Sequence, residues 1–193
     1  MKYKLILLIM ICLTSVAVYA QTSIYDQAVN DIESNSISLS GYSGKKLLFI
    51  VLPLTSSDTT VRQQLLRFQQ RYDSSRVRII GLVAMEEGYS SENKAAVEEL
   101  YADNIQAGLL LTTGIAVRKS SGSSQAPLLQ WLTNKDNNLH YDQDADEVGK
   151  KFFVSETGRL YAVLGASTPL DGRIIDRICN ADVPADQPSN PQN

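Results

Sequence analysis

Cysteine is the side chain with the widest chemistry available to this chain, because a thiolate can act as nucleophile, redox centre or metal ligand. The sequence has only two, Cys12 and Cys179, and no Cys-x-x-Cys pair. If Cys12 belongs to a cleaved N-terminal signal, Cys179 remains alone and the mature chain can form no internal disulfide. Two roles stay open for Cys179: a buried apolar side chain, or an exposed thiol that links two copies.

A serine nucleophile is the second chemical candidate. Ser56 and the single histidine, His140, would be the members of a hydrolase pair. No Gly-x-Ser-x-Gly elbow is present, which argues against that chemistry. The simpler interpretation is that Ser56 and Ser57 close a strand and cap the helix that begins near Asp58.

A polar loop between residues 134 and 146 is a partial match to a calcium-binding loop. Its oxygen-bearing side chains are Asn134, Asp136, Asn138, Asp142 and Asp144. A calcium loop of this spacing has glycine at its sixth position and an acid at its twelfth, where this chain has Leu139 and Ala145. The alternative is a solvated turn loop rich in Asn and Asp.

The strands that must position these residues follow from the apolar runs. Residues 46–54 and 78–85 form continuous apolar, β-branched runs, which predict buried central strands. A third, shorter strand is predicted at 105–111. Two further strands, 151–154 and 160–164, are separated by Glu-Thr-Gly and predict a hairpin.

Helices are predicted where apolar side chains recur at helical spacing. The four sets are Val61, Leu65, Phe68 and Tyr72; Val97, Leu100 and Tyr101; Leu128, Trp131 and Leu132 after Pro127; and Leu170, Ile174, Ile175 and Ile178 after Thr168-Pro169. A Ser/Gly loop is predicted at 120–125. The order is therefore β-α-β-α-β, one more helix, a hairpin and a last helix, which predicts an α/β protein with a central mixed sheet flanked by helices.

Three segments are predicted along the chain. Residues 1–20 are typical of a signal peptide: Lys2 and Lys4 precede a short apolar run, and Val18-Tyr19-Ala20 ends it before Gln21. An uncleaved N-terminal anchor is the alternative. Residues 21–179 form one domain, and residues 180–193, rich in Pro, Asp and Asn, are expected to be a disordered tail. We therefore expect an exported protein, periplasmic or extracellular, with no stable membrane span after cleavage.

The charge of the chain excludes one class of partner. Its formal net charge is −3 and its pI is about 5.2, and no basic cluster is present. A nucleic-acid binder needs a positive surface, so none is expected as a partner. No cofactor motif is present, and no cofactor is expected.

Several phrases resemble the glutathione peroxidase family. They are Ser23-Ile24-Tyr25-Asp26, Ser38-Leu39-Ser40-Gly41-Tyr42-Ser43-Gly44-Lys45, Pro127-Leu128-Leu129-Gln130-Trp131-Leu132-Thr133, and Lys151-Phe152-Phe153-Val154 followed by Thr157-Gly158-Arg159-Leu160. The resemblance spans most of the predicted mature chain. It implies a thioredoxin-like fold with an N-terminal hairpin and an inserted helix.

The family's chemistry depends on a peroxidatic Cys or selenocysteine, a Gln, a Trp and an Asn. The resemblance places these roles on Ser56, Glu86, Glu147 and Val148, so all four residue types are missing. A serine hydroxyl is far less acidic than a thiol and forms no reversible sulfenic acid. Glu86 would also oppose ionisation of any neighbouring nucleophile.

These observations favour a non-catalytic role. We expect a binding or interaction module of the cell envelope, a pseudoenzyme whose partner is an unknown protein or small molecule. The alternative is a thiol-dependent peroxidase or oxidoreductase of the oxidative stress response, acting through a divergent site or through Cys179. A dimer linked through Cys179 is possible but not favoured.

Overall fold

The structure is a computed structural model that describes residues 23–57 and 59–183. The predicted signal peptide, 1–20, and most of the predicted tail lie outside the described residues, so both stay predictions. Residues 180–183 of the predicted tail are described, and Asn180 is the last residue of the C-terminal helix, so the predicted tail boundary is wrong at this residue. None of the helices in the described part is long and apolar enough to cross a membrane.

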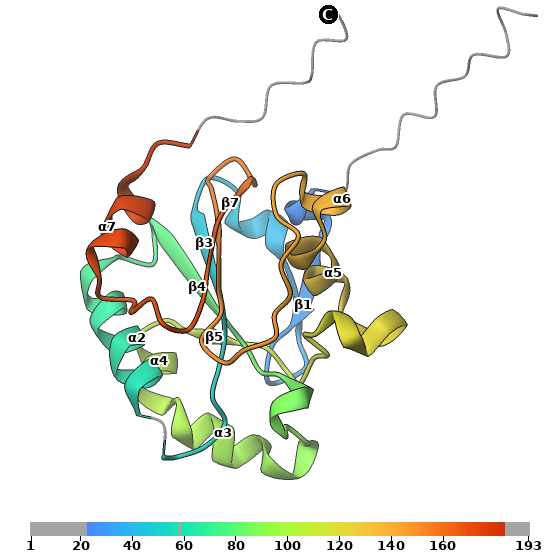
Figure 1. The fold of residues 1–193 in the computed structure, drawn as a ribbon. Helices are drawn as coiled ribbons and strands as arrows, with labels where there is room; N and C mark the ends of the chain where they lie inside the picture. Colours follow the sequence, from blue (N-terminus) through green and yellow to red (C-terminus); the bar gives the residue numbers. More distant parts are fainter. Residues whose placement is uncertain (1–22, 58, 184–193) are drawn as a thin grey trace, which may run out of the picture.

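A five-stranded mixed sheet forms the centre of the molecule, in the order β5-β4-β3-β6-β7 (Figure 1). The strands are β3 (Lys46–Val51), β4 (Val77–Leu82), β5 (Leu110–Leu111), β6 (Lys151–Val154) and β7 (Leu160–Leu164). β3 runs parallel to β4 and antiparallel to β6. The predicted hairpin strands are confirmed with the expected bounds.

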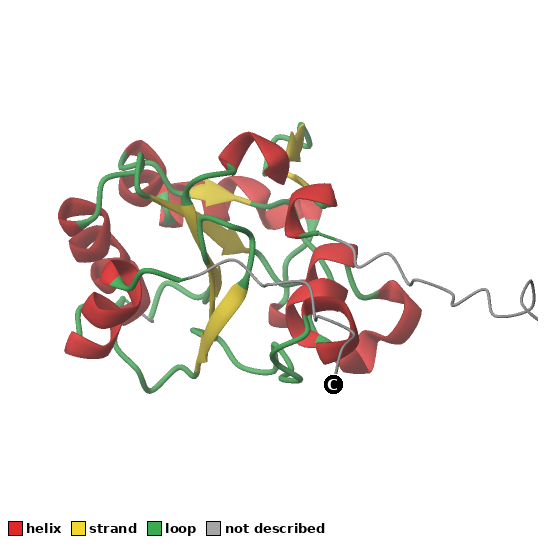
Figure 2. Ribbon diagram, turned by 90° about the horizontal axis from the view of Figure 1, so that it is seen from above, coloured by secondary structure: helices red, strands yellow, loops and turns green. Residues whose placement is uncertain are grey.

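Helices cover both faces of this sheet, as Figures 1 and 2 show. The helices are α2 (Thr60–Arg71), α3 (Lys94–Leu100), α4 (Ala102–Gln106), α5 (Pro127–Thr133), α6 (Lys135–Asn138) and α7 (Arg173–Asn180). Helices α2, α3 and α7 contribute to the core on one face, and α5 contributes to the core on the other. α5 lies between β5 and β6 in the chain and is the predicted inserted helix.

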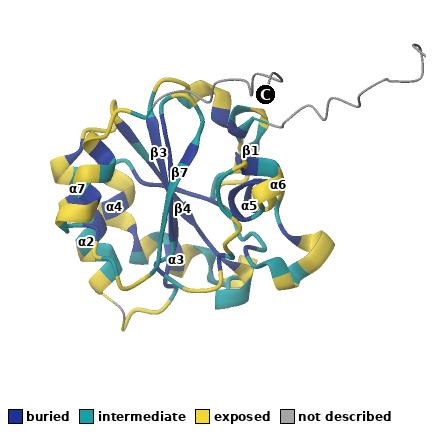
Figure 3. Ribbon diagram, turned by 45° about the horizontal axis from the view of Figure 1, so that its top comes forward, coloured by how far each residue is buried: buried dark blue, intermediate teal, exposed yellow. Residues whose placement is uncertain are grey.

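The alternation of side chains along β3 explains why its sequence is apolar without interruption. Leu47, Phe49 and Val51 pack against the α5 face, whereas Leu48 and Ile50 pack against the face of α2 and α7. A strand buried on both faces needs apolar residues at every position. Figure 3 shows this arrangement as buried strands between helices whose outer sides are exposed.

A short N-terminal hairpin extends the β5 edge of the sheet. It consists of β1 (Ala28–Asn30) and β2 (Ser36–Ser38), which pair antiparallel. The backbone N–H of Ile32 donates to the Leu111 carbonyl at 2.9 Å, and the N–H of Thr113 donates to the Asn30 carbonyl at 2.9 Å. The predicted N-terminal hairpin is therefore confirmed, and it covers part of a short edge strand.

Three sequence-based predictions need correction. The strand predicted at 105–111 is only two residues long, because Ile105 belongs to α4 and a turn at Gly108 precedes the strand. The Ser/Gly loop predicted at 120–125 is largely a 3-10 helix, Lys119–Ser124. The last helix begins at Arg173 rather than at Thr168-Pro169, since the N–H of Gly172 closes a turn onto the Pro169 carbonyl.

The inward face predicted for the last helix is partly wrong as well. Ile175 is buried, but Ile174 is 54% exposed. The helix starts later than predicted, so the residues that share its buried side are Ile175 and Cys179, four positions apart.

Candidate functional site

The topology brings the four positions implied by the family resemblance to one end of the sheet. Ser56 follows β3 and Glu86 follows β4, and these parallel strands end at the same edge. Glu147 and Val148 precede β6, which is antiparallel to β3 and therefore begins at that edge. The backbone thus brings the four predicted positions to one edge of the sheet.

Ser56 lies in an exposed turn at 55–57. The Arg62 guanidinium closes this turn by donating to the carbonyls of Thr55 and Ser56 at 3.3 and 3.2 Å. The predicted capping role is wrong, because α2 begins after Thr59 and the Thr59 side chain makes no cap bond. The structure pairs His140 with Arg159, whose Nε donates to His140 Nε2 at 3.1 Å, and gives no support to a hydrolase pair with Ser56.

Glu86 is a half-buried carboxylate that holds the following loop in place. Its Oε1 accepts from the backbone N–H groups of Val117 and Arg118 at 2.9 and 3.0 Å and from the Ser121 hydroxyl at 2.7 Å. Burial tends to raise the pKa of Glu86, but these hydrogen bonds outweigh it, so the pKa lies below its ordinary value. Glu86 is therefore an ionised structural acceptor at neutral pH.

An open hollow lies beside this carboxylate. Its volume is about 620 Å³, and we call it the Glu86 hollow. The residues that line it are Met85, Glu86, Gly114, Ile115, Ala116, Ser121, Ser124 and Ala126. Met85 is 56% exposed at the hollow, where a flexible thioether can adapt to a ligand. The other walls consist mainly of small residues, with Gly114, Ala116 and Ala126 beside Ile115, Ser121 and Ser124.

Glu147 and Val148, the other two implied positions, lie just before β6. The Glu147 carboxylate accepts from the backbone N–H of Ala166 at 3.0 Å and lies 4.0 Å from the Lys150 ammonium. Val148 is half-buried. Polar groups of Ser56, Glu86 and Glu147 therefore each have a partner of their own among the described residues.

Lys151 is a residue of this region whose special environment the sequence analysis missed. It is 2% exposed, and its Nζ donates to the carbonyls of Gly149 at 2.6 Å and Gly165 at 3.1 Å. Burial lowers the pKa of Lys151 to about 8, with Glu147 partly opposing the shift. A lysine that opens an otherwise apolar strand was the available signal. Both observed contacts are to backbone, which indicates a structural role.

Cys179 is the single cysteine in the described part of the chain, and it lies far from this chemistry in the fold. It is 2% exposed in the core between the sheet and α7, on the face opposite α5. Burial raises the pKa of its thiol to about 12, with Lys46 partly opposing the shift. The thiol is therefore protonated at neutral pH and hidden from solvent, which resolves the two roles left open by the sequence in favour of a buried side chain.

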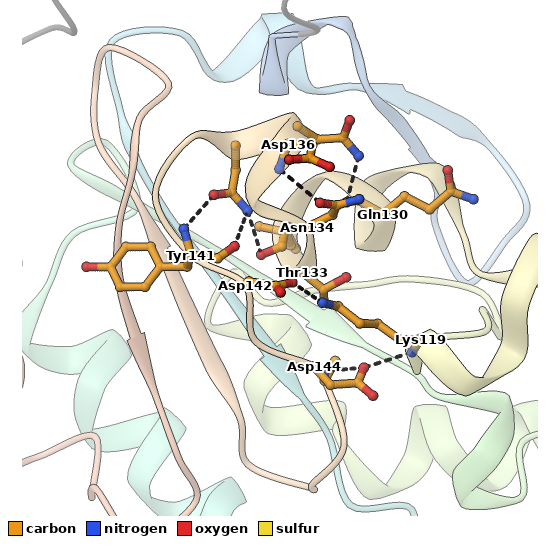
Figure 4. A network of polar contacts seen from close by, with 12 residues as sticks. Lys119, Gln130, Thr133, Asn134, Asp136, Tyr141, Asp142 and Asp144 are labelled. Carbon is orange, nitrogen blue, oxygen red and sulfur yellow. Dashed lines mark hydrogen bonds and ion pairs between the residues drawn. The ribbon is translucent and has the colours of Figure 1, made fainter.

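Two residues of the proposed calcium loop, Asn134 and Asn138, bind backbone groups through their side chains. Figure 4 shows Asn134 beside Asp136. Asn134 Oδ1 accepts from the N–H of Asp136 at 2.9 Å and so caps α6. The buried Asn138 amide donates to the carbonyls of Trp131 and Tyr141, each at 2.9 Å. Its oxygen accepts from the Tyr141 N–H at 2.8 Å, so this side chain is fully engaged.

The last two residues of the loop contact Lys119 instead of a shared centre (Figure 4). Asp142 forms an ion pair with the Lys119 ammonium, and Asp144 Oδ1 accepts from the Lys119 backbone N–H at 2.8 Å. Within residues 23–57 and 59–183, no group of three or more His, Cys, Asp or Glu side chains is placed to hold a metal ion. The arrangement resembles the solvated turn loop more than a calcium site.

Comparison with known proteins shows the fold. No family model matches the sequence, and no curated protein matches it. Among solved structures, the apo form of Trgpx has a TM-score of 0.61 at 19% identity, covering 82% of this chain and 94% of that one. T. cruzi GPX1 has a TM-score of 0.58 at 13% identity, covering 81% and 94%.

A thiol-disulfide isomerase from Corynebacterium glutamicum is also similar, with a TM-score of 0.54 at 13% identity, covering 84% of this chain and 99% of that one. The chain therefore has the thioredoxin-like fold, and its structural neighbours include glutathione peroxidases. This confirms the fold that was predicted from the sequence. At these identities the likeness concerns the fold and not the chemistry.

Proposed function

We propose that this chain is a non-catalytic binding module of the cell envelope and that the Glu86 hollow is its binding site. The observation that supports this most directly is the position of Cys179. Cys179, the one cysteine among the described residues, is 2% exposed on the buried side of α7, whereas the hollow is on the α5 side of the sheet. Cys179 and the Glu86 hollow are thus on different faces of the sheet.

The electrostatics of the hollow support the same proposal. A peroxidatic site has to stabilise an anionic nucleophile, which requires hydrogen-bond donors that point at it. In this chain the donors that point at the Glu86 carboxylate are the N–H groups of Val117 and Arg118 and the Ser121 hydroxyl, so these three groups already serve an anion. A second anion beside Glu86 would be destabilised by charge repulsion. Glu86, which occupies the position that the resemblance implies for the family's glutamine, therefore disfavours the family's reaction.

Export to the periplasm or the cell exterior is part of the proposal. It rests on the Lys2 and Lys4 start, the short apolar run and the Val18-Tyr19-Ala20 end. An exported pseudoenzyme would use an enzyme-derived fold to present a binding surface, because one scaffold can support unrelated functions. Intact-mass measurement on protein from the native envelope tests this part: we expect a chain that begins at Gln21, and a chain that retains residues 1–20 contradicts it.

The experiment that tests the absence of catalysis is steady-state turnover of hydrogen peroxide and a lipid hydroperoxide. Glutathione and thioredoxin serve as the two reductants. We expect rates equal to those of a buffer blank. Turnover by the unmodified chain that disappears in Cys179→Ser would overturn the proposal and make Cys179 a redox residue. The matched control is Ser57→Ala, a change on the exposed turn that leaves every cysteine in place.

A further inference from the structure

A second, smaller hollow adjoins the Glu86 hollow. The second one has a volume of about 250 Å³ and lies between β1 and the start of α5. Three residues line both hollows: Gly114, Ile115 and Ala126. The backbone of Gly114 and Ile115 therefore lies at both hollows, and Ala116 lies at the larger one.

One edge of this backbone segment is already paired as a parallel strand. The N–H of Ile115 donates to the Val83 carbonyl, and the N–H of Met85 donates to the Ile115 carbonyl, each at 3.0 Å. In a trans peptide, the C=O of one residue and the N–H of the next point in opposite directions. Because the N–H and C=O of Ile115 are bonded to Val83 and Met85, the C=O of Gly114 and the N–H of Ala116 point to the opposite edge.

That opposite edge is covered at its two ends and open between them. At one end the N–H of Thr113 donates to the Asn30 carbonyl at 2.9 Å, and at the other the N–H of Ala126 donates to the Ala116 carbonyl at 3.0 Å. Between these bonds, the N–H and C=O of Gly114 and the N–H of Ala116 form no hydrogen bond with any residue of 23–57 or 59–183. These are the donors and acceptors of an unpaired strand edge.

Glycine at position 114 is required by the packing around this edge. A Cβ atom there would lie 2.1 Å from Tyr89 Cδ1, so any side chain would displace the Tyr89 ring. The Tyr89 ring thus packs on Gly114, and the small side chains of Ala116 and Ala126 leave room beside the edge. The opening thus combines unpaired peptide groups with space for a second chain.

We propose that this gap binds an extended peptide segment of a partner protein, which adds to residues 114–116 as a short parallel β-strand. One peptide residue opposite Ile115 donates its N–H to the Gly114 carbonyl and accepts from the Ala116 N–H. A neighbouring side chain of the peptide enters the Glu86 hollow beside Met85. This inference rests on the proposed binding function and identifies its ligand as a peptide backbone rather than a small molecule.

The test is an NMR titration of the full ¹⁵N-labelled chain with defined peptides. The probes are hexapeptides acetyl-Thr-Val-X-Val-Thr-Lys-amide, in which X is Ala, Leu, Lys or Glu, and the same peptides N-methylated at X. We expect the amide signals of Gly114 and Ala116 to shift and their hydrogen exchange to slow. Since one hydrogen bond is worth roughly tenfold in affinity, N-methylation at X is expected to weaken binding about tenfold.

Ala126→Met provides the blocking variant, because its side chain fills the wall that both hollows share. Ala102→Met is the matched control, since it places the same side chain in a separate hollow between α2 and α4. Well-dispersed spectra of both variants establish that they fold. We expect Ala126→Met to abolish the shifts at Gly114 and Ala116, and Ala102→Met to leave them unchanged.

Two results would overturn the peptide inference. One is that no probe shifts or protects the Gly114 and Ala116 amides up to millimolar concentration. The other is that the N-methylated probes bind as tightly as their parents. Neither result affects the turnover assay. The non-catalytic function fails only if turnover is measured, so its failure is distinguishable from failure of the peptide inference.

Discussion

Replacement of Glu86 tests whether this residue is the structural support of the hollow. The carboxylate accepts from the N–H groups of Val117 and Arg118 and from the Ser121 hydroxyl. Hydrogen bonds to a charged group contribute about 1.5–3 kcal/mol each, but donors that return to water recover most of that. Ser121 and Arg118 are half-exposed, so water can reach them when Glu86 is replaced. Val117 is 1% exposed, so without the Glu86 carboxylate its N–H would stay buried with no partner.

From these contacts we expect Glu86→Ala to lower the free energy of unfolding by about 3 kcal/mol. Glu86→Gln keeps an acceptor oxygen and loses only the charge, so we expect a loss of about 1 kcal/mol. The matched control is Glu87→Gln. Its ion pair with Arg118, at 2.6 Å between partly exposed side chains, is expected to contribute at most about 1 kcal/mol. Urea unfolding at neutral pH measures all three.

The pH dependence gives an independent check on the same residue. The pKa of Glu86 is lower in the folded chain than its ordinary value of 4.5. The stability from the ionised carboxylate is therefore fully present above pH 4.5 and lost as the pH falls through the lower folded value. The difference between the wild-type chain and Glu86→Gln should shrink in that range. Equal stabilities of Glu86→Ala and Glu87→Gln at neutral pH would refute the structural role assigned to Glu86.

Three further predictions concern other parts of the fold. Burial lowers the pKa of Lys151 to about 8, so its charged form opposes folding below pH 8, and this penalty is lost as the pH rises towards 10.5. The free energy of unfolding of the wild-type chain should therefore rise between pH 8 and 10.5. Lys151→Met should remove this rise, which urea titrations at several pH values measure. Leu139 has a left-handed backbone conformation, φ 65°, and is 48% exposed. Leu139→Gly is therefore expected to stabilise the chain by about 0.5–1 kcal/mol in thermal unfolding. A lower stability of this variant would show that the leucine side chain has a packing role. Four of the five proposed calcium ligands, Asn134, Asn138, Asp142 and Asp144, are engaged in contacts within the chain, so the melting temperature should not change between EDTA and millimolar calcium. A rise with calcium would restore the calcium interpretation.

The sequence predicted the sheet well because the sheet depends on local patterns. The apolar run in β3 and the two strands around Glu156-Thr157-Gly158 are features of six to ten neighbouring residues, and they appear in the structure where they were expected. The predictions failed where a boundary depends on a turn. Ile105 is apolar and adjoins a strand, yet it lies in α4, because periodicity alone does not separate a short helix from a short strand.

The site was only half predictable for a related reason. The positions Ser56, Glu86 and Glu147 were located by the resemblance, and they do lie at one edge of the sheet, where β3 and β4 end and β6 begins. The partners of Glu86, in contrast, lie about thirty positions further along the chain, and no local pattern predicts that a carboxylate will accept from the backbone of Val117. The unpaired edge at Gly114 is likewise a property of backbone geometry, which leaves no mark in residue type beyond the glycine itself.

The reactivity of Cys179 in the folded chain tests the central claim most directly. The measurement uses the full chain carrying Cys12→Ser, so that one thiol remains, and follows iodoacetamide and hydrogen peroxide adducts by intact mass at pH 7. Because this thiol is 2% exposed and burial raises its pKa to about 12, we predict no adduct in native buffer and complete alkylation once the chain is unfolded in urea. Rapid modification of Cys179 in native buffer would contradict the claim that the fold presents no reactive thiol.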